Sequence, residues 1–225
     1  MQRILIINDS GMNTREIRNL SDSIKLSEEQ RAIIVGLMLG DGHLATQNKG
    51  RTYRLLVEHS LSQGEYVDWL YQRFDRMVLT GPHHKTQIVK GEEYSKYYFT
   101  TVSTPALRFY GKLFYPQGKK VVPDIIAKLL TPLSLAIWFM DDGSCKSKFH
   151  RARIINTQGF ALHDILKLQD ALERKFGIKT TQRKQKEGMQ LYIPSTEIER
   201  FFSLISPYIL PSMEYKIRLT PLHKL

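Results

Sequence analysis

The chain has 225 residues, of which 42% are hydrophobic and 24% charged, a composition that is ordinary for a globular protein. Lysine and arginine outnumber aspartate and glutamate by 33 to 22, and the resulting net charge of +11 favours an anionic partner, first nucleic acid and second an anionic membrane. No segment approaches the roughly 20 apolar residues of a membrane span, and the single cysteine, Cys145, excludes an internal disulfide and predicts a reducing compartment, such as the cytoplasm of a prokaryote or an organelle matrix.

Residues 1–26 are interpreted as an N-terminal extension. The apolar run at residues 4–7 is too short for a secretion signal and predicts a short strand that ends in a turn at residues 8–11. Ser27 has Gln30 three positions later, a capping-box pattern that marks the beginning of a helix.

An internal repeat is the most informative feature of the sequence. Two apolar segments, at residues 33–42 and 135–143, each predict a short helix that ends in Asp-Gly, and Asp41 and Asp142 are 101 residues apart. Thr131 is a favoured N-cap residue at the beginning of the second helix. Both helices are apolar on nearly all sides, so we expect them to be buried against each other. We also expect the glycine after each aspartate to adopt the left-handed conformation.

The same pattern of elements follows each of these helices. It comprises a basic strand-like run, an amphipathic helix, a hairpin and a closing helix. In the first half these lie at residues 51–57, 64–74, 84–102 and 106–114, and in the second at 151–155, 162–176, 178–193 and 197–206. The sequence therefore predicts an α+β fold of two αββαββα repeats, at residues 27–125 and 126–225.

The repeated aspartates favour metal-dependent chemistry. Cleavage of a phosphodiester needs a positioned metal ion and neutralisation of charge on the phosphate, and Mg²⁺ prefers oxygen ligands. Two paired helices that each end in an aspartate would bring two carboxylates together, one for each DNA strand. A role in helix capping is the alternative for either aspartate alone. Repetition within a strongly basic chain favours the metal-binding interpretation.

The paired motifs resemble those of the LAGLIDADG homing endonucleases, in the type with two motifs in a single chain. Segments 119–123, 130–143 and 207–216 are similar to the type encoded by a yeast mitochondrial intron, and the resemblance begins near residue 27. It implies paired motif helices at the centre and two antiparallel sheets that form a saddle over double-stranded DNA. It also implies that a monomer cuts a long, non-palindromic site across the minor groove, with Mg²⁺ or Mn²⁺, and leaves short 3′ overhangs.

The resemblance places the metal-binding acids of the family on Asp41 and Asp142. Gly40 and Asp141 precede them and are included in the predicted metal site. Asp141 is the rival acid in the second motif, but Asp142 directly precedes a glycine, as Asp41 does.

The resemblance also places the basic residues near the scissile phosphates on Lys120 and Lys216. They lie 79 residues after Asp41 and 74 residues after Asp142, respectively. For either lysine alone, an ordinary solvated surface position is the alternative.

The two motif helices differ at the positions that would touch. Gly36 and Gly40 permit close backbone approach, whereas the matching residues of the second helix are Ile137 and Asp141. The helix interface is therefore expected to be asymmetric, which suits a non-palindromic target.

Polar side chains alternate along both hairpins and are expected to read bases in the major groove, where Arg and Lys contact guanine and Gln contacts adenine. A solvated sheet face is the alternative. Tyrosines 94, 97 and 98 and Phe99 are expected in the core. Together with the basic strands, the hairpins give a predicted DNA-binding set of Arg51, Arg54, Lys85, Gln87, Arg151, Arg153, Gln158, Lys179, Thr181, Arg183 and Gln185.

Two other functions remain open on the same fold. An intron RNA maturase would make intron RNA a second partner, and a DNA-binding regulator would not cut. Both motif aspartates are present, which favours retained cleavage. The chain shows no intein-like ends, and no glycine-rich phosphate loop supports a metabolic phosphate enzyme.

Overall fold

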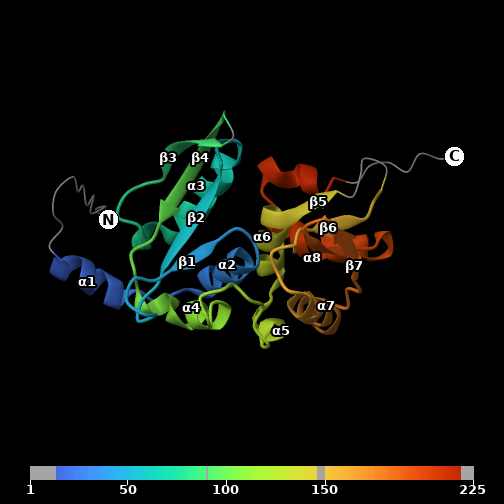
Figure 1. The fold of residues 1–225 in the computed structure, drawn as a ribbon, viewed down its shortest axis with the longest axis horizontal. Helices are drawn as coiled ribbons and strands as arrows, with labels where there is room; N and C mark the ends of the chain where they lie inside the picture. The colour runs from blue at the N-terminus through green and yellow to red at the C-terminus, as the bar shows by residue number, and fades with distance from the viewer. Residues whose placement is uncertain (1–13, 90, 146–149, 219–225) are drawn as a thin grey trace. The chain divides into compact units, whose positions relative to one another are not determined.

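The computed structural model describes residues 14–89, 91–145 and 150–218 (Figure 1). The strand predicted at residues 4–7 lies outside these ranges, as does Lys90 in the predicted first hairpin turn. No helix in the described ranges is both long enough and apolar enough to traverse a lipid bilayer.

The first repeat has the predicted order of elements. Its helices and strands are α2 (Glu28–Leu39), β1 (His43–Ala45), β2 (Arg54–Ser60), α3 (Gly64–Phe74), β3 (His83–Val89), β4 (Glu92–Thr100) and α4 (Arg108–Phe114). It is preceded by α1 (Thr14–Ser23), a helix that the sequence pattern did not predict. Ser21 of α1 donates to the carbonyl of Ser103 at 2.7 Å, and Thr104 donates back to the carbonyl of Ser21 at 2.8 Å.

The second repeat has the same order after a short unpredicted helix, α5 (Ile126–Leu129). Its elements are α6 (Pro132–Asp142), β5 (Gly143–Cys145), β6 (Arg153–Ile155), α7 (Leu162–Phe176), β7 (Thr181–Gln185), β8 (Gly188–Ile193) and α8 (Ile198–Ile205). A 3₁₀ turn at Pro211–Lys216 follows. The predicted αββαββα order is confirmed in both halves.

The compact units of the structure do not coincide with the sequence repeats. One unit comprises residues 14–30 and 41–112, and the other comprises residues 31–40 and 113–218. Most of α2 therefore belongs to the same unit as α6, whereas Asp41 belongs to the first unit.

The sheet of the first unit has strand order β1-β2-β4-β3 and is antiparallel throughout. Alternation along β2 buries Leu55, Val57 and His59 on one face and leaves the intervening residues more accessible. Helix α3 packs on the buried face, where Asp68 accepts a hydrogen bond from the Tyr97 hydroxyl at 2.9 Å. The opposite face of this sheet is called the first open face below.

The sheet of the second unit repeats this topology with strand order β5-β6-β8-β7. Ile155, Leu191 and Ile193 are buried on the face that α7 covers. The side chain of Gln169 in α7 accepts a hydrogen bond from Gln182 at 2.7 Å, so the even-numbered residues of β7 face this helix. The opposite face is called the second open face.

Local sequence signals position both motif helices. At α2 the Ser27 hydroxyl accepts from the Gln30 amide at 3.1 Å, and the Gln30 side chain accepts from the Ser27 amide at 2.9 Å. At α6 Thr131 and Ser134 form the corresponding capping box. These reciprocal bonds satisfy amides that have no partner within the helix.

The two motif helices approach closely at the predicted glycines. A Cβ atom on Gly36 would lie 2.5 Å from the Ile137 Cβ and 2.6 Å from the Ser134 carbonyl oxygen. A Cβ atom on Gly40 would lie 2.6 Å from the Cβ of Asp141. The predicted asymmetry is confirmed, because glycine on one helix faces a larger side chain on the other.

The expected left-handed glycines after the motif aspartates are wrong. Gly143 has φ −73° and ψ 140°, an extended conformation in which α6 leads directly into β5. Gly42 is also absent from the glycines with positive φ in the described ranges. Gly143 is required for space instead, since a Cβ atom there would collide with the ring and carbonyl of Phe139.

The substitution Gly36→Ala is expected to destabilise the protein by about 1–3 kcal/mol, because the added methyl group meets a backbone carbonyl that cannot rotate away. Gly81→Ala is the matched control, since a Cβ atom at Gly81 has no neighbour within 4 Å. Urea unfolding measures both variants. A Gly36→Ala variant as stable as the control would contradict the close helix packing.

Candidate functional site

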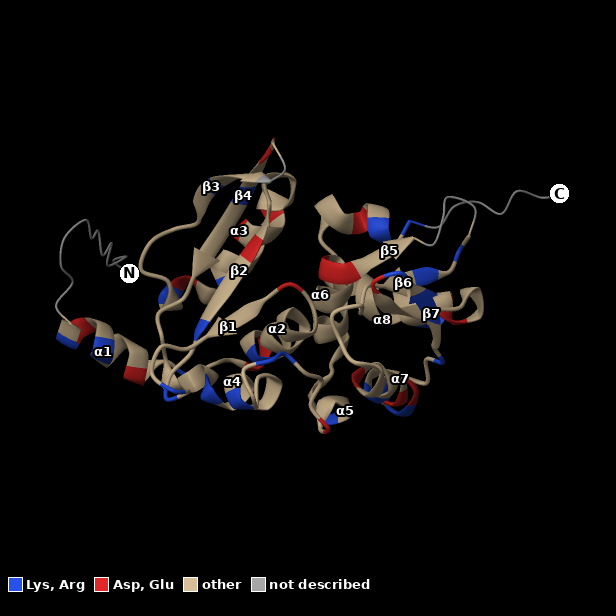
Figure 2. Ribbon diagram, in the orientation of Figure 1, with Lys and Arg blue, Asp and Glu red and all other residues tan. Residues whose placement is uncertain are grey.

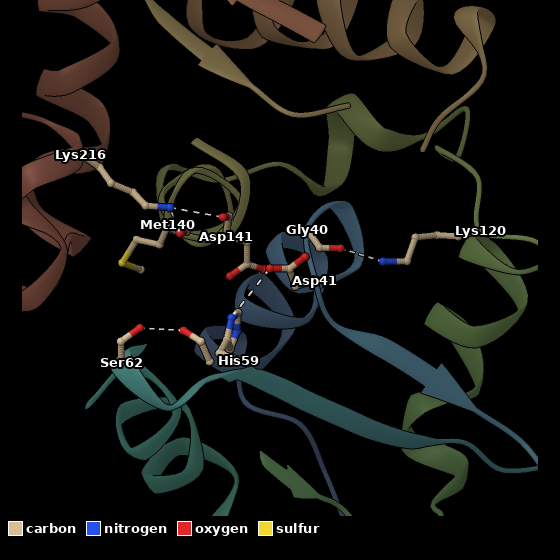
Figure 3. Close-up of polar contacts among 9 residues, drawn as sticks. Gly40, Asp41, His59, Ser62, Lys120, Met140, Asp141 and Lys216 are labelled. Atoms are coloured by element: carbon tan, nitrogen blue, oxygen red, sulfur yellow. Dashed lines mark hydrogen bonds and ion pairs between the residues drawn. The ribbon is translucent and has the colours of Figure 1, made fainter. Parts of the chain in front are cut away.

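Two lysines make parallel contacts at the ends of the motif helices (Figure 3). The Lys120 ammonium donates to the carbonyl oxygen of Gly40 at 2.8 Å. The Lys216 ammonium donates to the carbonyl of Met140 and to that of Asp141, the latter at 3.2 Å. The structure thus brings both predicted lysines to the backbone beside the predicted acids.

The helix contacts identify which acid of the second motif corresponds to Asp41. Residues related by a twofold axis touch each other where two helices cross on that axis. Gly36 faces Ile137 and Gly40 faces Asp141, and both pairs are offset by 101 positions. The same offset relates Asp41 to Asp142. The Lys216 contacts alone permit either register, because this lysine binds two successive carbonyls.

Both acids lie at the transition from a motif helix to its first strand. Asp41 occupies the turn between α2 and β1, with its side chain 53% exposed. Asp142 is the last residue of α6 and is half-buried, and its carbonyl accepts from the Asn156 amide at 3.0 Å. Each acid is therefore fixed by backbone structure on both sides.

A histidine beside Asp41 was not predicted from the sequence. His59 Nδ1 lies 3.8 Å from Asp41 Oδ2 (Figure 3), and the His59 ring packs against Tyr66 of α3 with centroids 5.0 Å apart. The alternation of β2 could have identified His59 from the sequence. Leu55 and Val57 predict that the next position on the same face is buried and apolar, and this position holds a histidine.

A pocket opens beside Asp41 in the first unit. Its lining carries both charges and imidazoles, which suits polar ligands rather than an apolar molecule. The lining residues are Asp41, His43, Leu56, Glu58, His59, Ser60, Gln63 and Lys96.

The first open face carries several of the predicted DNA-binding residues. Arg54, Lys85 and Gln87 lie on it, as the register of β2, β3 and β4 requires. Lys85 pairs with Glu58 at 2.5 Å and lies 5.3 Å from the ring centroid of Tyr98. Lys96 lies opposite Lys85 in the ladder and extends this basic strip, although the sequence reasoning did not single it out.

The expectation that all four aromatic residues of β4 enter the core is partly wrong. Phe99 is fully buried, but Tyr94 is 44% exposed and Tyr98 is half-buried on the first open face. Tyr97 is half-buried on the helix-covered face. Strand alternation sends Tyr94 and Tyr98 to the open face, opposite Gln87 and His83.

The second open face carries Thr181, Arg183 and Gln185, as predicted. In the ladder Arg183 lies opposite Gln190, whose side chain donates to Asn156 at 2.8 Å. Figure 2 shows Lys and Arg along β7 and charges of both signs on α7. The open side of this sheet therefore presents hydrogen-bonding groups in a fixed order.

Arg153 corrects the predicted DNA-binding set. It is only 1% exposed and donates to the carbonyls of Lys216 at 3.0 Å and Arg218 at 2.8 Å. It lies opposite Ile193 in the ladder, so alternation directs it into the buried face. Burial lowers the pKa of the Arg153 guanidinium. Arg153 thus anchors the segment that carries Lys216 rather than contacting DNA.

The remaining predicted residues lie in loops around the sheets. Arg51 is exposed, and its carbonyl accepts from Arg108 at 2.7 Å. Arg151 forms an ion pair with the exposed Glu199. Gln158 is half-buried in the loop after β6, and Lys179 is exposed before β7.

Comparison with known proteins finds one family match. The LAGLIDADG DNA endonuclease family matches residues 31–201, a range that includes most of α2, all of α6 and both sheets.

Individual relatives and a solved structure resemble nearly the whole chain. The DNA endonuclease I-ChuI of Chlamydomonas applanata is 29% identical over 86% of this chain and 96% of its own length. The cytochrome b mRNA maturase bI2 of Debaryomyces hansenii is 30% identical over 85% of this chain and 74% of its own. The homing endonuclease I-WcaI bound to its DNA recognition sequence has a TM-score of 0.88 and 25% identity, covering 95% of this chain and 96% of that one.

Proposed function

The chain belongs to the LAGLIDADG DNA endonuclease family and is a homing endonuclease acting on double-stranded DNA, and we propose that Asp41 and Asp142 hold the divalent ions with which it cuts one bond in each strand. The site is long and non-palindromic, and the cut leaves short 3′ overhangs. A single chain with two repeats supplies one acid for each strand.

The repeated arrangement of a lysine, a backbone carbonyl and an adjacent acid carries this proposal. Lys120 holds the carbonyl that precedes Asp41, and Lys216 holds the carbonyl of Asp141, which precedes Asp142. An aspartate that only ended a helix would need no lysine bound to the carbonyl beside it. Two such lysine contacts, one beside each aspartate, are expected if both sites have the same function.

The donor set fits a hard divalent ion such as Mg²⁺ or Mn²⁺, because Asp41 and Asp142 supply carboxylate oxygens. Such an ion would supply Lewis acidity to the scissile phosphate. Lys120 and Lys216 fix the backbone that presents the acids and place positive charge beside the phosphate, where negative charge increases in the transition state.

The open faces of the two sheets supply the DNA contacts. Arg183 lies on the second open face, opposite Gln190 in the ladder, and offers hydrogen bonds suited to guanine edges. Lys85 and Lys96 provide charge on the first open face, and Arg51 in its exposed loop suits a phosphate contact. The two faces carry different side chains, which agrees with a non-palindromic site.

A maturase function is the second candidate. The observation that favours it is the 30% identity to the Debaryomyces hansenii maturase over most of this chain. Adding the purified chain to its own intron transcript tests it. Faster splicing supports the maturase function. Unchanged splicing by a chain that still cleaves DNA supports the endonuclease function only.

The substitutions Asp41→Asn and Asp142→Asn are each expected to reduce double-strand cleavage at least about 10³-fold, because the amide is a weaker metal ligand than the carboxylate. DNA affinity should change only about threefold, since phosphate and base contacts supply it. Asp141→Asn is the matched control and should be milder. Cleavage and gel-shift assays measure both quantities, and an inactive Asp141→Asn beside an active Asp142→Asn would reverse the assignment.

The substitutions Lys120→Met and Lys216→Met are expected to slow cleavage by about 10²-fold while weakening DNA binding much less, because the charge acts mainly on the transition state. Single-turnover cleavage rates and dissociation constants at the same salt concentration separate the two effects. Equal losses in cleavage rate and DNA affinity would show that these lysines only contact the DNA backbone.

The substitution Arg183→Ala is expected to cost about 1–3 kcal/mol at one base pair and to relax base preference there, because the side chain lies on the second open face. Lys184→Ala, the next residue on the other face of β7, should leave the preference unchanged. Cleavage profiling over every position of the site compares them. An identical profile for wild type and Arg183→Ala would show that Arg183 does not read a base.

A further inference from the structure

His59 is a buried nitrogen donor that the mechanism above does not use. Its side chain is 2% exposed, yet its Nδ1 atom points at the carboxylate of Asp41. The backbone of His59 is fixed in β2 and its imidazole packs against the ring of Tyr66, so the direction of the imidazole is set by packing. A buried apolar residue would satisfy the packing of this strand equally well.

The distance between the two donor atoms matches a shared ion. At 3.8 Å, His59 Nδ1 and Asp41 Oδ2 are too far apart for a hydrogen bond. Metal bonds to imidazole nitrogen and carboxylate oxygen are about 2.0–2.2 Å long. The imidazole nitrogen of His59 and the carboxylate oxygen of Asp41 would therefore hold one ion together.

We propose that His59 is a nitrogen ligand of the ion held by Asp41, and that it makes this site prefer Mn²⁺ or a similar transition-metal ion over Mg²⁺. The proposal rests on the metal-binding function of Asp41 stated above. Imidazole suits transition metals, whereas Mg²⁺ favours oxygen donors alone and its affinity gains little from a nitrogen ligand.

The second repeat lacks this ligand. Register matching places Thr157 at the position of His59, because β5 pairs with β6 as β1 pairs with β2. Thr157 is 1% exposed, and its hydroxyl already donates to the Met189 carbonyl at 2.8 Å. In the described part of the chain, Thr157 offers no nitrogen where His59 does, so the two proposed metal sites are chemically unequal.

Pulsed electron paramagnetic resonance of the full chain with Mn²⁺ alone tests the proposal. We expect ¹⁴N coupling from one imidazole in the wild type, lost in Asp41→Asn and retained in Asp142→Asn. His59→Gln should remove the coupling and weaken Mn²⁺ binding about tenfold, while Mg²⁺ affinity stays within about twofold. His43→Gln, a histidine that lines the same pocket, should retain the coupling.

The outcomes separate the two claims. Mn²⁺ that binds in an Asp41-dependent manner without ¹⁴N coupling overturns the role of His59 and leaves the proposed function standing. Coupling that is lost in His43→Gln but not in His59→Gln also overturns it. Mn²⁺ binding that is unchanged in both Asp41→Asn and Asp142→Asn overturns both proposals. The wild-type spectrum decides the first case even when His59→Gln does not fold.

Discussion

The contact between α2 and α6 is the constraint on which the rest of the structure depends. Both helices are apolar on nearly every side. Exposure of either helix to water would cost more free energy than a single small repeat could offset. Gly36 and Gly40 let the backbone of α2 approach the side chains of Ile137 and Asp141. That approach fixes the register of the helices, and the register brings Gly40 at the end of α2 beside Asp141 at the end of α6.

The proposed metal-binding acids lie at the helix ends, where the chain turns into a sheet. Each motif helix leads within a few residues to the first strand of its sheet, so an acid at this point is braced by a helix before it and a strand after it. The lysines extend this bracing from later segments of the chain. Arg153 also stabilises this arrangement, because its buried guanidinium donates to carbonyls of the segment that carries Lys216. The buried arginine thus supports the site without belonging to the DNA surface.

Local signals predicted most of the fold, because caps and periodicity act over a few residues. Ser27 with Gln30 marked the beginning of α2, and the apolar period of residues 162–176 matched α7 at both ends. The candidate acids followed from their repetition in the sequence, and the candidate lysines followed from the resemblance to the family. The predictions that were wrong or missing depended on strand register, which cannot be determined from the sequence. Arg153 lies between apolar residues on both sides, so its face was ambiguous until its pairing with Ile193 was known. His59 was missed for the same reason, since its neighbour Asp41 is distant in sequence.

The central claim is that this chain cuts both strands of a specific DNA site with the help of divalent ions. The most direct measurement incubates the full chain with a randomised DNA library and sequences the ends produced in Mg²⁺, in Mn²⁺ and in chelator. The structure predicts breaks in both strands at one long, asymmetric sequence, with short 3′ overhangs and only when a divalent ion is present. Breaks that persist in chelator, or ends that define no sequence, would contradict it.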